Sequence, residues 1–188
     1  YDRTKSIGIC FSGRFSREKG ADVIIEILPR LMNEFKNLHF SLAGSDSTDA
    51  EGRSRIDLLK ESLFSCGCED RFRWIPSIDY YEMPKFYREH SIFISPTLFE
   101  SFGNTLAEAQ ACGLPVVACR TGGVPEVVQD GLSGLLSNVS DCNSFYTNLR
   151  SLVVDNELRL KMGNAAAAWA RERFSFSSVS EKYERLIS

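Results

Sequence analysis

The stretch that decides the fold is residues 7–44, which read IGICFSGRFSREKGADVIIEILPRLMNEFKNLHFSLAG. It begins with an apolar run, Ile7–Phe11, that predicts a short strand. A polar loop follows, and apolar side chains then recur at helical spacing over residues 23–35. Pro29 lies inside that segment, so we expect it to kink or split the helix. A second apolar run, Leu38–Ala43, completes a strand–helix–strand unit.

The same alternation continues along the chain. Further apolar runs predict four more strands, the last of them short: Phe72–Ile75, Ile92–Ser95, Val116–Cys119 and Gly131–Leu136. The segments between them predict helices: Arg53–Phe64, Tyr80–Glu89 and Asn104–Cys112. After Asp141, a side chain suited to cap a helix, the remainder is expected to be helical. Repeated strand–helix units predict an α/β fold, a Rossmann-like parallel sheet of about six strands with helices on both faces. Ligands are then expected at the carboxyl ends of the strands.

Composition narrows the class of protein. The chain has 188 residues, of which 43% are hydrophobic and 25% charged, and its formal net charge is −3. A length and composition of this kind are typical of one globular domain. The absence of a basic surplus argues against nucleic-acid binding. Since no apolar run approaches the ~20 residues that span a bilayer, we expect no transmembrane segment.

The six cysteines include no CxxC pair, and His39 and His90 lie in unrelated segments, so no zinc site is expected. Reduced thiols in a cytoplasmic protein are the expected state, with any membrane association peripheral. The sequence begins at Tyr1 rather than at a methionine and shows no signal peptide, so we expect a fragment of a longer protein.

The loop after the first predicted strand carries a basic cluster. Arg14, Arg17 and Lys19 follow Gly13 and stand just before a helix, in a loop that has neither the GxGxxG nor the GxxxxGK[ST] order. Cations are unfavourable at a helix N-terminus, by a few tenths to ~1 kcal/mol each, which suggests that an anion is held there. The alternative is a solvated basic turn that Glu18 partly neutralises.

The loop after the fourth predicted strand is the second candidate. Residues 95–109 read SPTLFESFGNTLAEA. Gly103 lets the backbone approach a ligand closely, and the amides of residues 102–105 open a helix where an anion or a hydroxyl-rich ligand can bind. Glu100 and Glu108 flank that helix start, and carboxylates accept hydrogen bonds from sugar hydroxyls. Taken singly, either acid could instead cap the helix or form an ion pair.

Seven residues separate Glu100 from Glu108, and this spacing resembles the E-x7-E motif of retaining glycosyltransferases of the GT-B architecture, family 4 type. The order of further motifs matches as well: GRFSREKG at 13–20, LAG at 42–44, PTLFESFG at 96–103, ACGLPVVA at 111–118, TGGVPE at 121–126 and DGLSG at 130–134. The resemblance covers nearly the whole chain. It implies that residues 1–188 form one C-terminal nucleotide-sugar-binding domain and that the N-terminal acceptor domain is absent.

The resemblance also implies roles for individual residues. Arg14 and Lys19, in the loop that begins at Gly13, would contact the donor diphosphate. Glu100 would bind hydroxyls of the transferred sugar, and Glu108 the ribose hydroxyls. The phosphate and the sugar would be held by the backbone of four consecutive residues: Phe102, Gly103, Asn104 and Thr105.

The nucleotide base would lie against the loop that starts with Ile75, Pro76 and Ser77. Pro76 stands where many relatives carry glycine, so the base is left open among uridine, guanosine and adenosine. Thr97 in place of the usual serine is a conservative departure. Tyr80 and Tyr81 could stack on the base.

The implied reaction is retaining transfer of a hexose from a nucleotide diphosphate sugar (UDP-, GDP- or ADP-sugar) to an acceptor hydroxyl. The acceptor would be a glycan, a lipid-linked sugar or a small molecule, in polysaccharide, lipopolysaccharide or glycolipid biosynthesis. Asp46 and Asp49 do not form a DxD pair, so a metal-independent reaction without a cofactor is expected. Two alternatives are a sugar-nucleotide-binding module without catalysis and a GT-B nucleotide-sugar epimerase.

Overall fold

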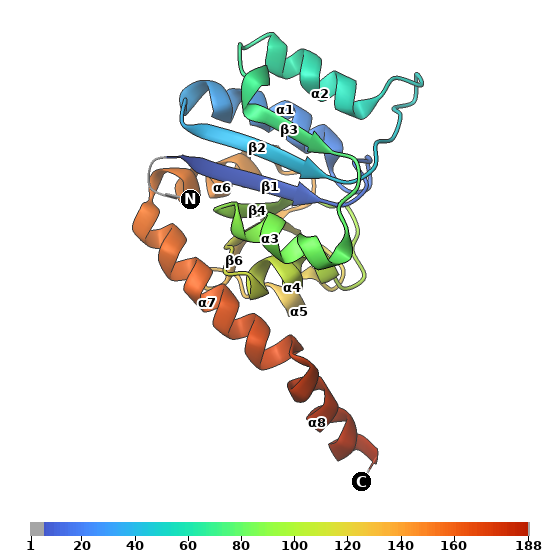
Figure 1. Ribbon diagram of the computed structural model, residues 1–188, viewed down its shortest axis with the longest axis vertical. Helices are drawn as coiled ribbons and strands as arrows, with labels where there is room; N and C mark the ends of the chain where they lie inside the picture. Colours follow the sequence, from blue (N-terminus) through green and yellow to red (C-terminus); the bar gives the residue numbers. More distant parts are fainter. Residues whose placement is uncertain (1–5, 188) are drawn as a thin grey trace.

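All six strands run parallel, in the order β3-β2-β1-β4-β5-β6 (Figure 1). Their bounds are β1 Ile7–Ser12, β2 Leu38–Ala43, β3 Phe72–Ile75, β4 Ile92–Ser95, β5 Val116–Arg120 and β6 Gly134–Asn138. The structure is a computed structural model that describes residues 6–187, so residues 1–5 and 188 of the expected domain lie outside the described residues. The predicted fold class, a Rossmann-like parallel sheet, is confirmed.

Helices cover both faces of the sheet. Their bounds are α1 Ala21–Glu34, α2 Arg55–Phe64, α3 Met83–Arg88, α4 Asn104–Ala111, α5 Val124–Val127, α6 Cys142–Val154, α7 Asn156–Phe174 and α8 Phe176–Ile187, with 3-10 turns η1 Glu69–Arg71 and η2 Tyr80–Glu82. Side chains of α1, α2 and α6 form one apolar core, and those of α3, α4 and α5 form the other. α7 packs on α4 and α6, and α8 continues away from the sheet (Figure 1).

The strands are largely apolar because both faces of the sheet are covered. On β1, Ile9 and Phe11 belong to the core under α1, whereas Cys10 between them belongs to the core under α3 and α4. β4 divides in the same way, with Ile94 on the first face and Phe93 on the second. Continuous apolar runs of this kind are typical of buried parallel strands, which is why their positions could be predicted closely.

The expected split of the first helix does not occur, because α1 runs unbroken from residue 21 to residue 34 with Pro29 inside it. Proline removes one backbone donor, so the carbonyl of Ile25 loses its usual helical partner. Leu28 and Leu31, on either side of Pro29, are fully buried against the sheet. This packing holds the turns before and after the proline in one helix.

The sixth strand begins three residues later than expected, at Gly134 rather than at Gly131. The chain first makes a turn in which the Gly131 amide donates to the Gly134 carbonyl at 2.8 Å. Asp130 closes this turn by accepting a hydrogen bond from the Leu136 amide at 2.9 Å. The Asp-Gly pair therefore forms a turn, and pairing with β5 starts only after it.

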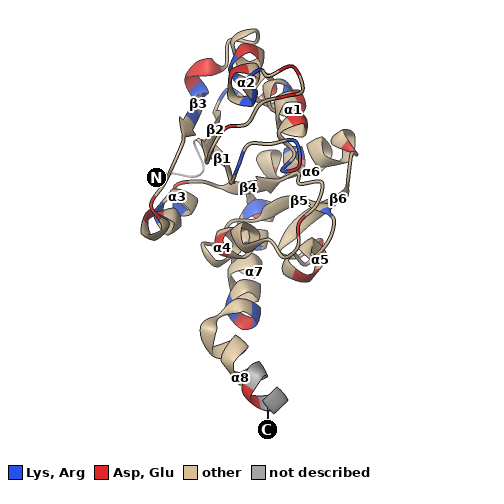
Figure 2. Cartoon of the chain, turned by 90° about the vertical axis from the view of Figure 1, so that its right-hand side faces the viewer, with Lys and Arg blue, Asp and Glu red and all other residues tan. Residues whose placement is uncertain are grey.

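The sheet has one topological switch point, between β1 and β4. β2 lies on one side of β1 and β4 on the other, so the chain leaves these two neighbouring strands in opposite directions. In doubly wound sheets, ligands bind in the crevice that opens outside the carboxyl ends at such a point. The carboxyl ends point to the right in Figure 1, and Figure 2 looks onto that edge.

α7 is the longest helix, with 19 residues, and it carries charged side chains along its length. No helix within residues 6–187 combines the length and the apolar character needed to cross a membrane.

Candidate functional site

The loops that follow β1 and β4 are hydrogen-bonded to each other across the switch point. The carbonyl of Glu18 accepts from the Leu98 amide at 2.8 Å and from the Thr97 hydroxyl at 3.0 Å. A Cβ atom on Gly20 would lie only 2.1 Å from the Pro96 carbonyl oxygen, and the φ of Gly20 is +80°. Only glycine fits this position, so the close approach of the two loops depends on it.

This contact brings together two predicted site residues. The Lys19 Nζ atom donates a hydrogen bond of 2.6 Å to Glu100 Oε2. The side chain of Lys19 is 39% exposed and that of Glu100 is 19% exposed, so the pair is partly open to solvent. The ammonium group keeps two further N–H donors for another acceptor.

The other two cations of the basic loop are open to solvent. Arg14 and Arg17 are exposed, and Gly13 directly follows β1, with its amide donating to the Ala43 carbonyl at 2.8 Å. A hydrogen bond from Ser16 lowers the pKa of Glu18, and the charge of Arg14 acts in the same direction. Glu18 thus neutralises part of the loop, as the solvated-turn interpretation expects, while Arg14 remains accessible to a ligand.

Helix α4 begins four residues after Glu100, with Gly103 as its N-cap in the left-handed region at φ +97°. The first hydrogen bonds of the helix run from the amides of Leu106 and Ala107 to the Gly103 carbonyl. The preceding amides, residues 102–105, find no acceptor within the described part of the chain. Free N–H groups at a helix N-terminus form an anion-binding site.

The loop after β5 supports Glu100 from the other side. The Gly123 amide donates to the Glu100 carbonyl at 3.0 Å, and the Thr121 hydroxyl donates to the Leu98 carbonyl at 3.0 Å. Three loops, from β1, β4 and β5, therefore form one hydrogen-bonded unit around the candidate site.

Glu108, the second acid of the motif, has a partner that the sequence did not reveal. The Tyr87 hydroxyl on α3 donates to Glu108 Oε2 at 3.0 Å and also lies 2.9 Å from Ser12 Oγ at the end of β1. Burial raises the pKa of Tyr87, so its hydroxyl stays protonated. The one available signal was the helical spacing of Met83 and Phe86 with Tyr87, which predicts a buried tyrosine on this helix.

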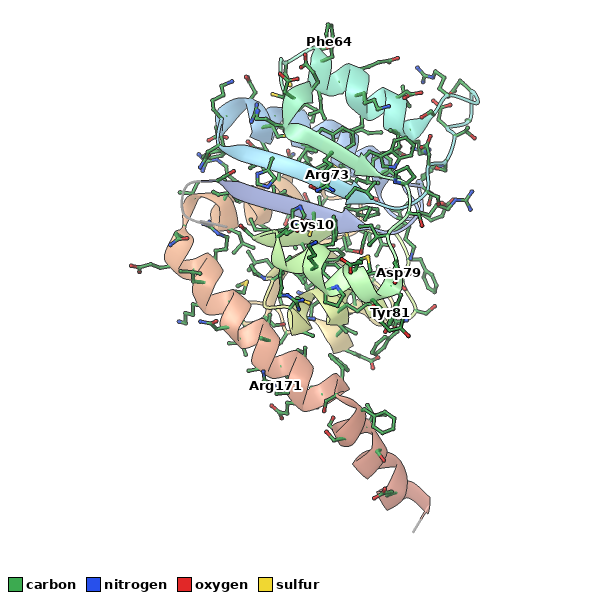
Figure 3. The ribbon with its side chains drawn as sticks, viewed as in Figure 1. Cys10, Phe64, Arg73, Asp79, Tyr81 and Arg171 are labelled. Carbon is green, nitrogen blue, oxygen red and sulfur yellow. The ribbon has the colours of Figure 1, made fainter. Side chains whose placement is uncertain are left out.

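The residues expected near the base lie further away, two strands from β1. Ile75 is half-buried and its carbonyl accepts from the Gly44 amide at 2.9 Å, whereas Pro76 and Ser77 are exposed. The adjacent tyrosine, Tyr81, is 86% exposed and lies at the same edge of the molecule as Asp79 (Figure 3). These residues therefore stand at the β3 end of the sheet's carboxyl edge.

Asp46 and Asp49 organise the loop after β2. Asp46 accepts hydrogen bonds from Ser54 Oγ and from the Ile56 amide, and Asp49 accepts from the Arg53 side chain. Within residues 6–187 no three His, Cys, Asp or Glu side chains gather as a metal-binding group would require.

The two histidines lie away from the carboxyl edge. His39 follows the first residue of β2, and His90 precedes β4 with its Nδ1 atom 2.7 Å from the Phe86 carbonyl. Both therefore belong to the amino end of the sheet, opposite the candidate site.

A parallel sheet in this order defines a Rossmann-like α/β domain, with a cation, a carboxylate and an open helix start gathered at its switch point. The chain belongs to the family of glycosyl transferases group 1, whose sequence profile matches residues 2–169.

About one third of the aligned residues are identical between this chain and its curated relatives. The D-inositol 3-phosphate glycosyltransferase of Corynebacterium jeikeium is 36% identical over 187 residues, which is 98% of this chain and 43% of the relative. The protein of the same name from Thermobifida fusca is 33% identical over 162 residues, 85% of this chain and 37% of the relative. The chain thus spans less than half the length of these relatives.

Solved structures share the fold. Anabaena HepE in complex with UDP superposes with a TM-score of 0.84 at 20% identity, covering 97% of this chain and 49% of HepE. The C-terminal domain of a glycosyl transferase group 1 family protein (LpcC) from Francisella tularensis gives 0.81 at 22% identity, covering 93% of this chain and 90% of that domain.

Proposed function

We propose that this chain is the donor-binding half of a retaining hexosyltransferase that uses a nucleotide diphosphate sugar. The observation that carries the proposal is the Lys19–Glu100 pair at the switch point, beside the open amides that begin α4. The family supports it, as do the titles of solved structures with the same fold, which describe HepE with UDP and with UDP-glucose.

The charges suit a departing diphosphate. When the bond between the sugar C1 and the phosphate oxygen breaks, the electron pair stays on that oxygen and negative charge grows there. Arg14, Lys19 and the α4 amides would stabilise this charge, and preorganised donors of this kind contribute about 3–4 kcal/mol each. In this scheme the acceptor hydroxyl attacks C1 from the same face, and its proton passes to the departing phosphate oxygen.

The two acids would bind hydroxyl groups. Glu100 can accept from the transferred sugar while Lys19, with three N–H groups, keeps its bond to Glu100 and donates to the phosphate. Glu108 would accept from the ribose, and the base would lie against Ile75 and Ser77. Uridine, guanosine and adenosine remain the candidate bases, and polysaccharide, lipopolysaccharide or glycolipid synthesis the candidate pathways.

The second half of the enzyme would lie outside this chain. The curated relatives are more than twice as long as the segment that matches them, whereas the LpcC C-terminal domain matches over 90% of its length. We infer that residues 1–188 bind the donor alone, and that transfer to the acceptor needs a further domain.

Thermal unfolding with UDP, GDP and ADP tests the proposal. At about ten times its Kd, a one-site ligand stabilises a protein by roughly 1.4 kcal/mol. For a chain of this length the Tm then rises by roughly 3–6 °C. One nucleotide should give this rise, Lys19→Ala should lose it, and Lys36→Ala, just after the C-terminal end of α1, should keep it. The absence of a shift and of calorimetric binding with all three nucleotides would overturn the proposal.

A further inference from the structure

One buried hydroxyl joins three elements around the candidate site. Tyr87 lies on α3 and is 1% exposed. Its oxygen is 2.9 Å from Ser12 Oγ, where β1 ends, and 3.0 Å from Glu108 Oε2 on α4. The three residues are 75 and 21 positions apart in the sequence, so only the tertiary fold brings them together.

The directions of these two hydrogen bonds follow from the donors present. An ionised carboxylate can only accept, so the single Tyr87 proton is donated to Glu108. The Ser12 hydroxyl must then donate to the Tyr87 oxygen. Because burial keeps Tyr87 protonated, the two bonds form a chain that runs from Ser12 through Tyr87 to Glu108. A hydrogen bond to an ionised acceptor is stronger than a neutral one.

The position of the Tyr87 hydroxyl is fixed by its ring. The ring packs edge-on against Phe93 on β4, with centroids 5.7 Å apart, and its neighbour Phe86 is also buried. Glu108, by contrast, is a half-exposed side chain with several rotamers, and it loses freedom only if something holds it. Tyr87 holds Oε2, whereas Oε1 has no hydrogen-bond partner among residues 6–187.

We propose that Tyr87 is a positioning residue for the nucleotide: it fixes one oxygen of Glu108 so that the carboxylate accepts hydrogen bonds from the adjacent hydroxyls of a ribose. The inference rests on the proposed function and deepens it, because it makes the choice of ribose over 2′-deoxyribose depend on a residue that touches no ligand. Tyr87 acts through Glu108 alone, so its removal should change that choice rather than phosphate binding.

The experiment compares each ribonucleotide with its 2′-deoxy form. Calorimetry on this chain gives Kd for whichever of UDP, GDP and ADP binds, and for its 2′-deoxy analogue. Wild type should prefer the ribonucleotide about tenfold, the effect of one hydrogen bond to a charged group. Tyr87→Phe should reduce the preference to about twofold or less. Tyr146→Phe is the matched control. The Tyr146 hydroxyl also donates to a glutamate, Glu34, at 2.9 Å, but Tyr146 lies on α6, outside the candidate site.

The outcomes separate the two proposals. If wild type binds none of the three nucleotides, the proposed function fails. If it binds one and Tyr87→Phe keeps the full ribose preference, or weakens ribose and deoxyribose forms equally, Tyr87 has only a structural role and the inference is overturned. In a Glu108→Gln background, Tyr87→Phe should have no further effect on the preference. Should Tyr87→Phe not fold, Ser12→Ala should reduce the preference in the same direction.

Discussion

Lys19 Nζ lies 2.6 Å from Glu100 Oε2, although 81 positions separate the two residues in the sequence. The pair joins the loop after β1 to the loop after β4 at the one place where the strand order reverses. The cation that we assign to the diphosphate and the carboxylate that we assign to the sugar therefore share one hydrogen bond before any ligand arrives.

The two members of this pair should differ in what they bind. Glu100→Gln should raise the Kd of the nucleotide sugar by roughly three- to tenfold and leave the Kd of the free nucleoside diphosphate within about twofold of wild type. The reason is that a carboxylate accepts a stronger hydrogen bond from a sugar hydroxyl than a neutral amide does. Lys19→Ala should weaken both ligands about tenfold. Calorimetry with the two ligands measures this, with Glu61→Gln on α2 as a control. Equal losses for both ligands in Glu100→Gln would mean that Glu100 serves only to hold Lys19.

Gly20 should be far less replaceable than Gly52, although both have φ +80°. An added Cβ costs about 1–2 kcal/mol at either position because of the left-handed backbone. At Gly20 it would also meet the Pro96 carbonyl at 2.1 Å, whereas at Gly52 nothing lies within 4 Å. Overpacking of this kind adds roughly 1–3 kcal/mol. In urea unfolding Gly20→Ala should therefore lose clearly more stability than Gly52→Ala, and equal losses would show that the loops can separate freely.

Replacing Pro29 should stabilise the protein. Pro29→Ala restores the amide that can donate to the Ile25 carbonyl inside α1, and the gain should be about 1–3 kcal/mol. Pro84 stands in the first turn of α3, where proline is tolerated, so Pro84→Ala should change stability by less than about 0.5 kcal/mol. Thermal unfolding of the two variants tests the difference. A lower Tm for Pro29→Ala would show that the proline fits α1 without a loss.

Because of His39, the free energy of unfolding should decrease as the pH is lowered below neutral. Burial lowers the pKa of His39 below its usual value near 6.5. The unfolded chain therefore takes up a proton at a pH where folded His39 is still neutral. The stability that neutral His39 contributes is fully present above pH 6.5, and it is lost as the pH falls toward the folded pKa. His90 faces His39 with ring centroids 6.0 Å apart. Both histidines line one surface pocket, and the charged groups of that pocket are Asp70, Arg71, Arg73 and Glu89.

Urea unfolding at pH 7.5 and at pH 5.5 measures this effect. The free energy of unfolding of wild type should decrease between the two pH values, and that of His39→Gln should decrease less. An identical decrease in both proteins would assign the pH dependence to other groups.

The strands were predictable because burial on both faces makes them largely apolar, so that they stand out between polar loops. Five of them begin at the predicted residue and end there or one residue later, whereas β6 starts late because the residues from Gly131 form a turn before the strand begins. Pro29 is a case where the local sequence misleads. Proline tends to break a helix, but the packing of Leu28 and Leu31 on the sheet outweighs that local tendency.

The candidate site was predictable in its parts but not in its connections. Lys19, Glu100 and Glu108 each carry a chemical type that a motif can indicate. Their partners come from other elements, and a hydrogen bond such as that from Tyr87 to Glu108 depends on how α3 lies beside α4. Sequence spacing contains no direct signal for a contact of that kind.

The hydrogen bonds among the loops after β1, β4 and β5 bear on how such a domain can diverge. Glu18, Leu98 and Gly123 each contribute a backbone group to these contacts, so an insertion in one loop would break bonds made by the other two. Evolution toward a new donor should therefore proceed by exchanging side chains on an unchanged backbone. Growth in length should be confined to the segments that these bonds do not include, such as the exposed turn at Gly52.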